Sequence, residues 1–276
     1  MPALIRIDDP DDPRLADYRE VRERDLVGRR GGFIAEGVVV LEKVIRSGRH
    51  PIRSVLVAEK RAATLAPLLA GLPEGVEAYA AGQAVMDAIV GFPIHRGVLA
   101  AGTRAEPDLE TLLANLPPRA VVMGLVGIAN HDNMGGLFRN AAAFGADAVV
   151  LDAGCCDPLY RKAIRVSVGA ALTTPFARGG EAGDLAARLA AAGFSLIALT
   201  PGGETDLADL RPAARTAVLF GAEGPGLPVS LMDRAETVRI EMAGGFDSLN
   251  VATTSGIVLH HMVATARRAR ALEALF

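Results

Sequence analysis

Short apolar runs alternate with amphipathic stretches along most of this chain. In the second half the runs are continuously apolar, which is typical of strands covered on both faces in a parallel sheet. They lie at 120–128, 148–151, 194–199, 217–220 and 238–242. Stretches with helical spacing separate most of them and follow the last, at 134–144, 159–171, 184–192 and 251–275. This alternation predicts an α/β domain, a parallel sheet with helices on both sides.

The first part of the chain predicts a smaller α/β module. Strands are expected at 33–37, 54–58, 76–79 and 98–101, and helices at 37–47, 61–70 and 84–90. Three prolines between 103 and 119 surround a short helical patch at 109–114 and indicate a linker. The predicted organisation is an acidic extension (1–25) leading into a short charged helix, a small domain (26–104), a linker (105–118) and a larger domain (119–276).

Composition adds a core and an uneven charge distribution. Hydrophobic residues make up 50% and charged residues 22% of the 276 residues, enough for a core throughout. The net charge of −3 argues against an indiscriminate nucleic-acid binder. Arginines nevertheless cluster at 19–30, 46–53, 161–165 and 267–270. Each cluster fits a solvated helix face, or a surface that holds phosphate groups.

Other features point to a cytoplasmic protein without a metal. No apolar stretch is long enough for a membrane-spanning helix, and the N-terminus lacks the basic and apolar regions of a secretion signal. Cys155 and Cys156 are adjacent and are the chain's two cysteines. Neighbouring cysteines rarely form a disulfide, and two thiols cannot build a zinc site alone. Reduced thiols are therefore expected.

A first polar segment runs from Asn133 to Ala141. Met134, Leu137 and Phe138 form an apolar stripe at helical spacing, and Arg139 lies off that stripe. Asn133 stands where an N-cap belongs. Alone, the segment predicts a capped amphipathic helix; the alternative is that Arg139 grips an anion at the sheet edge.

Two further polar segments follow strand runs. The turn from Gly221 to Gly226 needs glycines for its shape, but turn chemistry does not explain the carboxylate of Glu223. Ser248 and Asn250 precede the last helix, where capping is the ordinary explanation. The glycine spacing differs from the dinucleotide-binding fingerprint, which disfavours an NAD or FAD site.

Taken together, these segments resemble the motifs of the SpoU-type (TrmH-like) RNA ribose 2′-O-methyltransferases of the SPOUT superfamily. Their Asn-x-Gly-x-x-x-Arg-x-Ala motif matches 133–141, the Gly-x-Glu-Gly-x-Gly turn matches 221–226, and the Ser-Leu-Asn-Val step matches 248–251. Residues 160–169 are similar to the family's linking helix. The first module, with 33–37 and 95–99, resembles the ribosomal-protein-like substrate-binding domain that often precedes this catalytic domain.

The resemblance implies a deep trefoil knot in the C-terminal domain, homodimers that pair through the knot region, and S-adenosylmethionine as cofactor. The residues that it places around the cofactor are Leu199, Thr200, Gly221, Ala222, Glu223, Gly224, Ile240, Met242 and Leu249. Its catalytic residues are Arg139, Asn133, Glu223, Ser248 and Asn250. In this scheme Arg139 holds the phosphate beside the target ribose and Glu223 orients the arginine.

The expected function is methyl transfer to a ribose 2′-hydroxyl of structured RNA, bound by the first domain. The two-domain layout favours ribosomal over transfer RNA. A transfer-RNA 2′-O-methyltransferase, a catalytically silent RNA-binding or ribosome-assembly factor on the same fold, and an unrelated α/β enzyme that binds another nucleotide are the alternatives.

Overall fold

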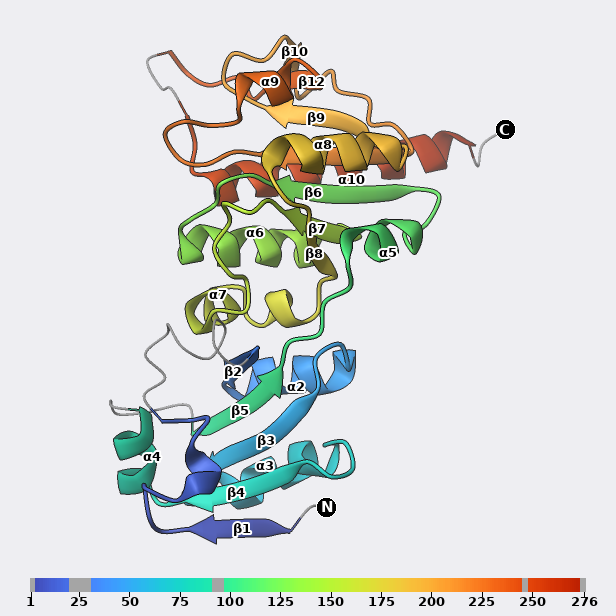
Figure 1. Cartoon of the computed structure of the whole chain (residues 1–276). Helices are drawn as coiled ribbons and strands as arrows, with labels where there is room; N and C mark the ends of the chain where they lie inside the picture. The colour runs from blue at the N-terminus through green and yellow to red at the C-terminus, as the bar shows by residue number, and fades with distance from the viewer. Residues whose placement is uncertain (1–2, 20–30, 91–96, 245–247, 274–276) are drawn as a thin grey trace. The chain divides into compact units, whose positions relative to one another are not determined.

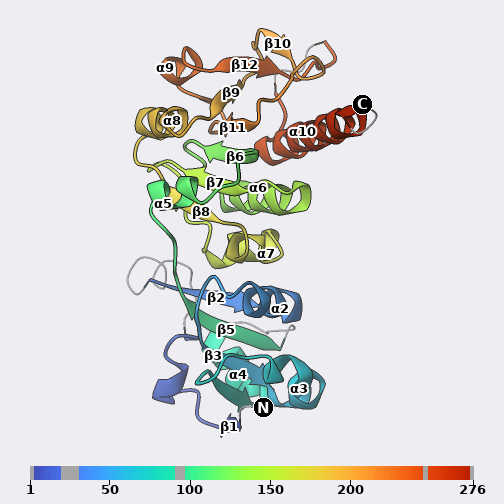
Figure 2. The ribbon, with the colours of Figure 1, turned by 90° about the vertical axis from the view of Figure 1, so that its right-hand side faces the viewer.

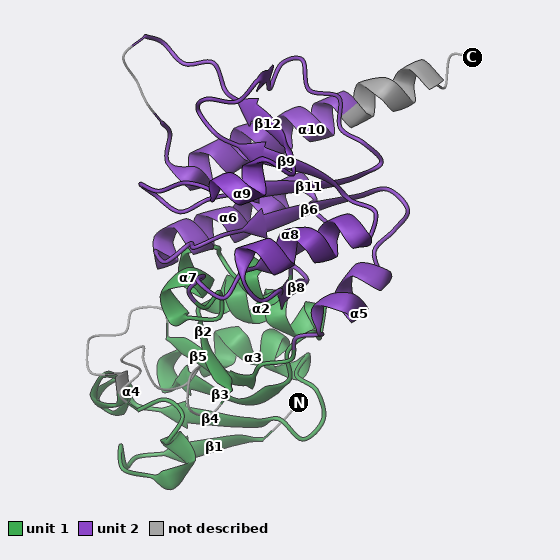
Figure 3. Cartoon of the chain, turned by 45° about the horizontal axis from the view of Figure 1, so that its top comes forward, with its two compact units in different colours: residues 1–105, 157–173 green, residues 106–156, 174–276 purple. Residues whose placement is uncertain are grey.

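The computed structural model describes residues 3–19, 31–90, 97–244 and 248–273, with side chains up to residue 265 in the last range. The chain divides into two compact units (Figure 3). Unit 1 contains residues 1–105 and 157–173, and unit 2 contains residues 106–156 and 174–276. His95 and Arg96, part of the first module's resemblance, lie outside the described residues, as do the arginines at 22–30.

Unit 1 is a five-stranded mixed sheet with short helices (Figure 1). Its strand order is β1 (Leu4–Ile7), β4 (Glu77–Ala81), β3 (Ile52–Ala58), β5 (Val98–Thr103) and β2 (Gly32–Glu36). β1, β4 and β3 are parallel, and β5 runs antiparallel to β3 and β2. Its helices are α2 (Val38–Ser47), α3 (Ala62–Ala70), α4 (Gln83–Val90) and α7 (Arg161–Val166), with 3-10 turns at Pro13–Leu15, Glu59–Arg61 and Ala170–Leu172.

Two features of unit 1 differ from the predicted organisation. Residues 4–7 of the expected extension form β1, which pairs with β4 and buries Ile7. The strand ends where the acidic residues of the extension begin. Residues 157–173, expected in the larger domain, are grouped with unit 1. Several contacts join this segment to unit 1: an ion pair between Arg161 and Glu36 (Nη2–Oε2 2.8 Å) connects α7 to β2, and Lys43 Nζ donates to the carbonyl of Val168.

Unit 2 is built on a seven-stranded parallel sheet, as predicted. The strand order is β10 (Thr205–Asp206), β12 (Glu236–Arg239), β9 (Ser195–Leu199), β11 (Arg215–Phe220), β6 (Ala120–Leu125), β7 (Ala148–Leu151) and β8 (Phe176–Arg178). Its helices are α5 (Leu109–Ala114), α6 (His131–Phe144), α8 (Ala182–Ala191), α9 (Val229–Met232) and α10 (Val251–Glu273). Figure 2 shows α6 and α10 on one face of the sheet and α5 and α8 on the other.

The core of unit 2 explains why this part of the chain is so apolar. The β6 and β11 runs contribute fully buried side chains such as Val122 and Leu219 between the two helix layers. The parallel register places Phe220 beside Leu125, so neighbouring strands end at one edge and their following loops meet there. The knot implied by the resemblance stays a prediction, and β8, β10 and α9 were not predicted because each is only a few residues long.

Candidate active site

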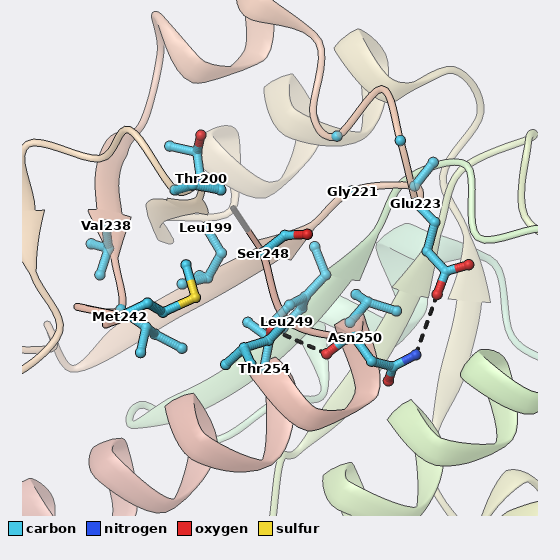
Figure 4. Close-up of a pocket in the computed structure, with 17 residues that line it drawn as sticks. Leu199, Thr200, Gly221, Glu223, Val238, Met242, Ser248, Leu249, Asn250 and Thr254 are labelled. Atoms are coloured by element: carbon cyan, nitrogen blue, oxygen red, sulfur yellow. Dashed lines mark hydrogen bonds between the residues drawn. The ribbon is translucent and has the colours of Figure 1, made fainter. Parts of the chain in front are cut away.

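A cavity of about 570 Å³ lies at the carboxyl ends of β9, β11 and β12 (Figure 4). It is lined by Leu199, Thr200, Pro201, Phe220, Gly221, Ala222, Glu223, Gly224, Gly226, Val238, Ile240, Met242, Ser248, Leu249, Asn250, Val251 and Thr254. Every residue predicted to surround a cofactor is in this set, and so are Ser248 and Asn250. The loops that follow three neighbouring strands therefore converge on one cavity, although their roles remain predictions.

A hydrogen-bonded network joins three of the predicted polar residues at this cavity. Asn133 Nδ2 donates to Glu223 Oε1 at 2.7 Å, and Asn250 Nδ2 donates to Asn133 Oδ1 at 2.8 Å. Asn250 Nδ2 also approaches Glu223 Oε1 at 3.2 Å (Figure 4). One carboxylate is thus held by two amides from two different helix starts. The three sequence segments meet here although 117 positions separate Asn133 from Asn250.

The side-chain oxygen and nitrogen of Asn250 bind different groups. Its Oδ1 accepts from the backbone N–H groups of Ala252 (2.9 Å) and Thr253 (3.3 Å), which caps α10. Its Nδ2 supplies the network described above. The capping explanation and the functional explanation of this residue are therefore compatible.

Asn133 is not the helix cap that its position in the motif suggested. Asn130 caps α6, because its side chain accepts from the backbone N–H groups of Asp132 and Asn133. Asn133 lies inside the first turn and is 7% exposed. Since a buried amide requires partners, its bonds to Glu223 and Asn250 satisfy a real need.

Close packing of α6 against α10 holds this arrangement in place. A Cβ at Gly136 would lie 2.6 Å from the Cβ of Ala252, so a larger residue would push the helices apart. Asn140 Nδ2 donates to the carbonyl of Ala252 (2.6 Å) and to Ser255 Oγ (2.9 Å). Both contacts lie in the first turns of α10, directly after Asn250, so they fix where the helix begins.

The loop that carries Glu223 depends on its glycines. A Cβ at Gly221 would lie 2.3 Å from the carbonyl carbon of Gly226, and Gly224 has a φ of 87°. Residues Ala222 and Gly226 form a β-bridge across this tight turn. In this turn Glu223 is exposed, and the glycines present backbone groups instead of side chains to the cavity.

Arg139 is not brought to the other four predicted catalytic residues of its own chain. It is exposed on α6 and does not line the cavity. Six residues along a helix place it about 120° around the axis from Asn133. The structure records no hydrogen bond or ion pair for Arg139 within the described ranges, so no bond to Glu223 supports the predicted orienting role. The recorded partners of Glu223 are Asn133 and Asn250.

Several residues that line the cavity were not predicted from the sequence. Val238 lies on β12, two residues before the predicted Ile240, and Thr254 lies one helical turn after the predicted Asn250. Thr254 Oγ1 donates to the carbonyl of Asn250 at 3.1 Å. Helical periodicity from Asn250 would have found Thr254, whereas Phe220 and Pro201 are visible only once the strand ends are known.

The cysteines and the acidic side chains offer no second candidate site in the described ranges. Neither Cys155 nor Cys156 is part of a disulfide. Cys155 is buried, and this burial raises the pKa of its thiol to about 12. Across the described ranges, no three or more His, Cys, Asp or Glu side chains gather in a way that could hold a metal ion. Within those same ranges, each helix is too short or too polar to cross a bilayer.

Comparison with known proteins agrees with the geometry of this site. The model of the SpoU rRNA Methylase family matches residues 120–260. The chain belongs to this family of RNA methyltransferases. A sequence named an uncharacterized tRNA/rRNA methyltransferase, from Mycobacterium tuberculosis, is 41% identical over 262 residues, which are 91% of this chain and 89% of that protein.

Two solved structures share the fold of this chain. An AdoMet-bound rRNA methyltransferase from Sinorhizobium meliloti superposes with a TM-score of 0.81 at 23% identity and covers 94% of this chain and 97% of its own. An RNA 2′-O ribose methyltransferase gives a TM-score of 0.79 at 24% identity and covers 95% and 99%. The mixed first sheet and the parallel second sheet are therefore the family's fold.

Proposed function

We propose that this protein transfers a methyl group from S-adenosylmethionine to a ribose 2′-hydroxyl of a structured RNA, with ribosomal RNA favoured over transfer RNA. The observation that carries this proposal is the convergence of three glycine-rich loops on one cavity beside the Asn133–Glu223–Asn250 network. Family membership and the AdoMet-bound structure from Sinorhizobium meliloti support the choice of cofactor.

The residues present fit such a cofactor. A cavity of about 570 Å³ lies within the range for small-ligand sites. Apolar side chains such as Leu199, Ile240 and Leu249 suit the flat and aliphatic parts of a nucleoside, and the glycine turn offers backbone groups at close range. The bound group would supply a methyl carried on a positively charged sulfur.

The chain's own polar residues would then orient the accepting hydroxyl. Glu223, fixed by two amides, presents its remaining oxygen lone pairs at the cavity rim, and Ser248 lies on the same rim. Arg139 would hold the phosphate beside the ribose and stabilise charge that develops on the attacking oxygen. It would not remove a proton, because a guanidinium stays protonated in proteins. Groups that stabilise developing charge in this way commonly lower the activation barrier by ~3–4 kcal/mol.

The exposed position of Arg139 supports a site shared between two copies. In a homodimer that pairs through the knot region, Arg139 of one copy would serve the cavity of the other. Unit 1 would bind the RNA in the cytoplasm.

Methyl incorporation into RNA tests the activity directly. We expect the protein to label ribosomal RNA from labelled S-adenosylmethionine, and mapping of alkali-resistant linkages to place the label on a ribose. Labelling of transfer RNA alone would correct the substrate, and binding of S-adenosylhomocysteine without any labelling would indicate the silent factor. Absence of S-adenosylhomocysteine binding in a calorimetric titration would overturn the proposal.

Arg139 variants test its role separately from cofactor binding. Arg139→Ala and Arg139→Lys should each reduce transfer ~100-fold or more, with S-adenosylhomocysteine affinity unchanged. A lysine supplies charge without the bidentate geometry, so near-normal activity of Arg139→Lys would contradict a bidentate phosphate clamp.

Mixing two inactive variants tests the shared site. After dissociation and reassociation of equal amounts of Arg139→Ala and Glu223→Ala, random pairing should restore roughly a quarter of wild-type activity if each site uses both copies. No restoration, with mixed dimers verified by mass spectrometry, would place Arg139 and Glu223 in the same copy's site.

A further inference from the structure

Several cationic side chains of unit 1 are neutralised by carboxylates of the same unit. Asp8 and Glu59 pair with Arg6, Asp12 with Arg14, Asp17 with Arg53, Asp157 with Arg104 and Glu36 with Arg161. In the part of unit 1 that the structure describes, no carboxylate is recorded within ion-pair distance of Lys43, Arg46 or Arg165. The sequence clusters therefore mix structural arginines with uncompensated ones.

Lys43, Arg46 and Arg165 lie on two segments that contact each other. Lys43 Nζ donates to the carbonyl of Val168 at 2.7 Å, and Ser47 Oγ donates to the carbonyl of Leu172 at 3.3 Å. The α2 helix thus lies against the turn that follows α7. Arg46 stands one turn after Lys43, and the carbonyl of Arg165 accepts from the N–H of Val168 at 3.1 Å. Both arginines are exposed.

The turn at this contact is held in a strained conformation. Val168 has a φ of 52°, and in the described part of the chain it is the one non-glycine residue with positive φ. For a β-branched residue this region costs of order 1–3 kcal/mol, and such residues concentrate at functional sites. The Lys43 bond fixes the strained carbonyl, so α2 and α7 keep one relative position. The exposed Glu42 is the single carboxylate within α2, which leaves three cations to one anion.

We infer that Lys43, Arg46 and Arg165 form a phosphate-binding surface of unit 1 that holds the backbone of the RNA substrate. The inference rests on the proposed function for the identity of the polyanion. Arginine matches a phosphate bidentately, and Lys43, whose ammonium is anchored to the Val168 carbonyl, adds a third positive charge. Backbone contacts of this kind set the position of an RNA without reading its sequence. We call the three residues the α2–α7 basic surface.

The salt dependence of RNA binding tests this surface. In the triple variant Lys43→Met, Arg46→Gln, Arg165→Gln, affinity for fragmented total ribosomal RNA should fall ~10-fold or more, and the slope of log K against log salt should shrink by about 2. Arg6→Gln is the matched control, because Arg6 is exposed but already paired and lies on β1, at the opposite edge of the sheet from β2. Its RNA affinity and slope should equal those of the wild type.

A double variant separates loss of charge from collapse of the turn. Arg46→Gln with Arg165→Gln keeps the Lys43–Val168 bond, and its slope should still shrink by about 1.4. Wild-type affinity and slope in the triple variant, with an unchanged unfolding midpoint, would overturn the inference. Binding is measured without cofactor, so a protein that loses RNA affinity in the triple variant but never transfers a methyl group would refute the proposed activity and leave the surface standing.

Discussion

Two carboxylates, one in each unit, are held in opposite ways. Glu36 ends β2 with a side chain 9% exposed, and the guanidinium of Arg161 binds it through two nitrogens. Glu223 is exposed in a glycine turn, and its recorded partners are the uncharged amides of Asn133 and Asn250. A buried charge needs an opposite charge, whereas a carboxylate that acts on a ligand must keep its own charge and some free lone pairs.

From this difference we expect Glu36 to contribute to stability and Glu223 to function. Glu36 links β2 to α7 and so closes unit 1 around residues 157–173. Glu223 links the starts of α6 and α10 without cancelling its charge. Removing each residue should therefore damage a different property of the protein.

The largest effect on stability is expected from Glu36→Ala. It would remove the recorded carboxylate partner of the Arg161 guanidinium, whose side chain is 11% exposed, and breaking a buried ion pair in this way typically costs about 3–5 kcal/mol. Denaturant unfolding followed by circular dichroism measures this loss. The additional change Arg161→Met should recover much of it, because the charge that lost this carboxylate is also removed. Glu59→Ala breaks the exposed pair with Arg6 and serves as the control with little change.

The reciprocal variant, Glu223→Ala, should lower stability less than Glu36→Ala and reduce methyl transfer ~100-fold, equivalent to about 2.7 kcal/mol of barrier. Two uncharged amides would lose one acceptor, but no charged group would be left buried without a counter-charge, and Asn133 keeps its bond to Asn250. Single-turnover rates with saturating RNA measure the effect. If Glu223→Ala instead unfolds the protein and retains the rate of its folded fraction, the contrast between the two carboxylates is wrong.

A third test uses the pH dependence of stability and the buried His50 of unit 1. His50 is 3% exposed, its Nδ1 accepts from the N–H of Ala105, and burial lowers its pKa to about 4. Below pH 6.5 the unfolded state binds a proton that the folded state does not, so stability falls until pH reaches about 4. The expected loss between pH 7 and pH 5 is about 2 kcal/mol. His50→Gln should flatten this dependence, and an unchanged slope would contradict a neutral buried imidazole.

The sequence predicted most of the fold because its long apolar runs leave few alternatives. All five runs of the second half became strands of one parallel sheet, and the central strands β6, β7 and β11 are almost fully buried. The short β1 and β10 could not be predicted, because two to four residues carry no period and depend on neighbouring strands. The grouping of residues 157–173 with unit 1 could not be predicted, because it rests on contacts between distant positions, such as the Arg161–Glu36 pair, which joins residues 125 positions apart.

The residues that line the site could be predicted from the sequence, but the hydrogen bonds between them could not. The glycine loops indicated the cavity, because only strand ends and tight turns place that many small residues beside polar ones. The motif suggested Arg139 as the group that Glu223 orients, and this role stays a prediction; within one chain the bonds of Glu223 reach Asn133 and Asn250. Hydrogen-bond partners depend on which side of a helix faces the turn, and the packing of Gly136 on Ala252 sets that orientation.

The smallest effect should come from separating the two jobs of Asn250. Asn250→Ser keeps an oxygen to cap α10 but removes the amide that binds Asn133 and Glu223, so stability should stay close to wild type while transfer falls. Asn250→Ala removes both, and should cost about 1 kcal/mol more in the free energy of unfolding. Thermal unfolding and methyl-transfer rates of the two variants give the comparison. Equal rates for Asn250→Ser and the wild type would show that capping alone explains this residue and that the network around Glu223 needs only Asn133.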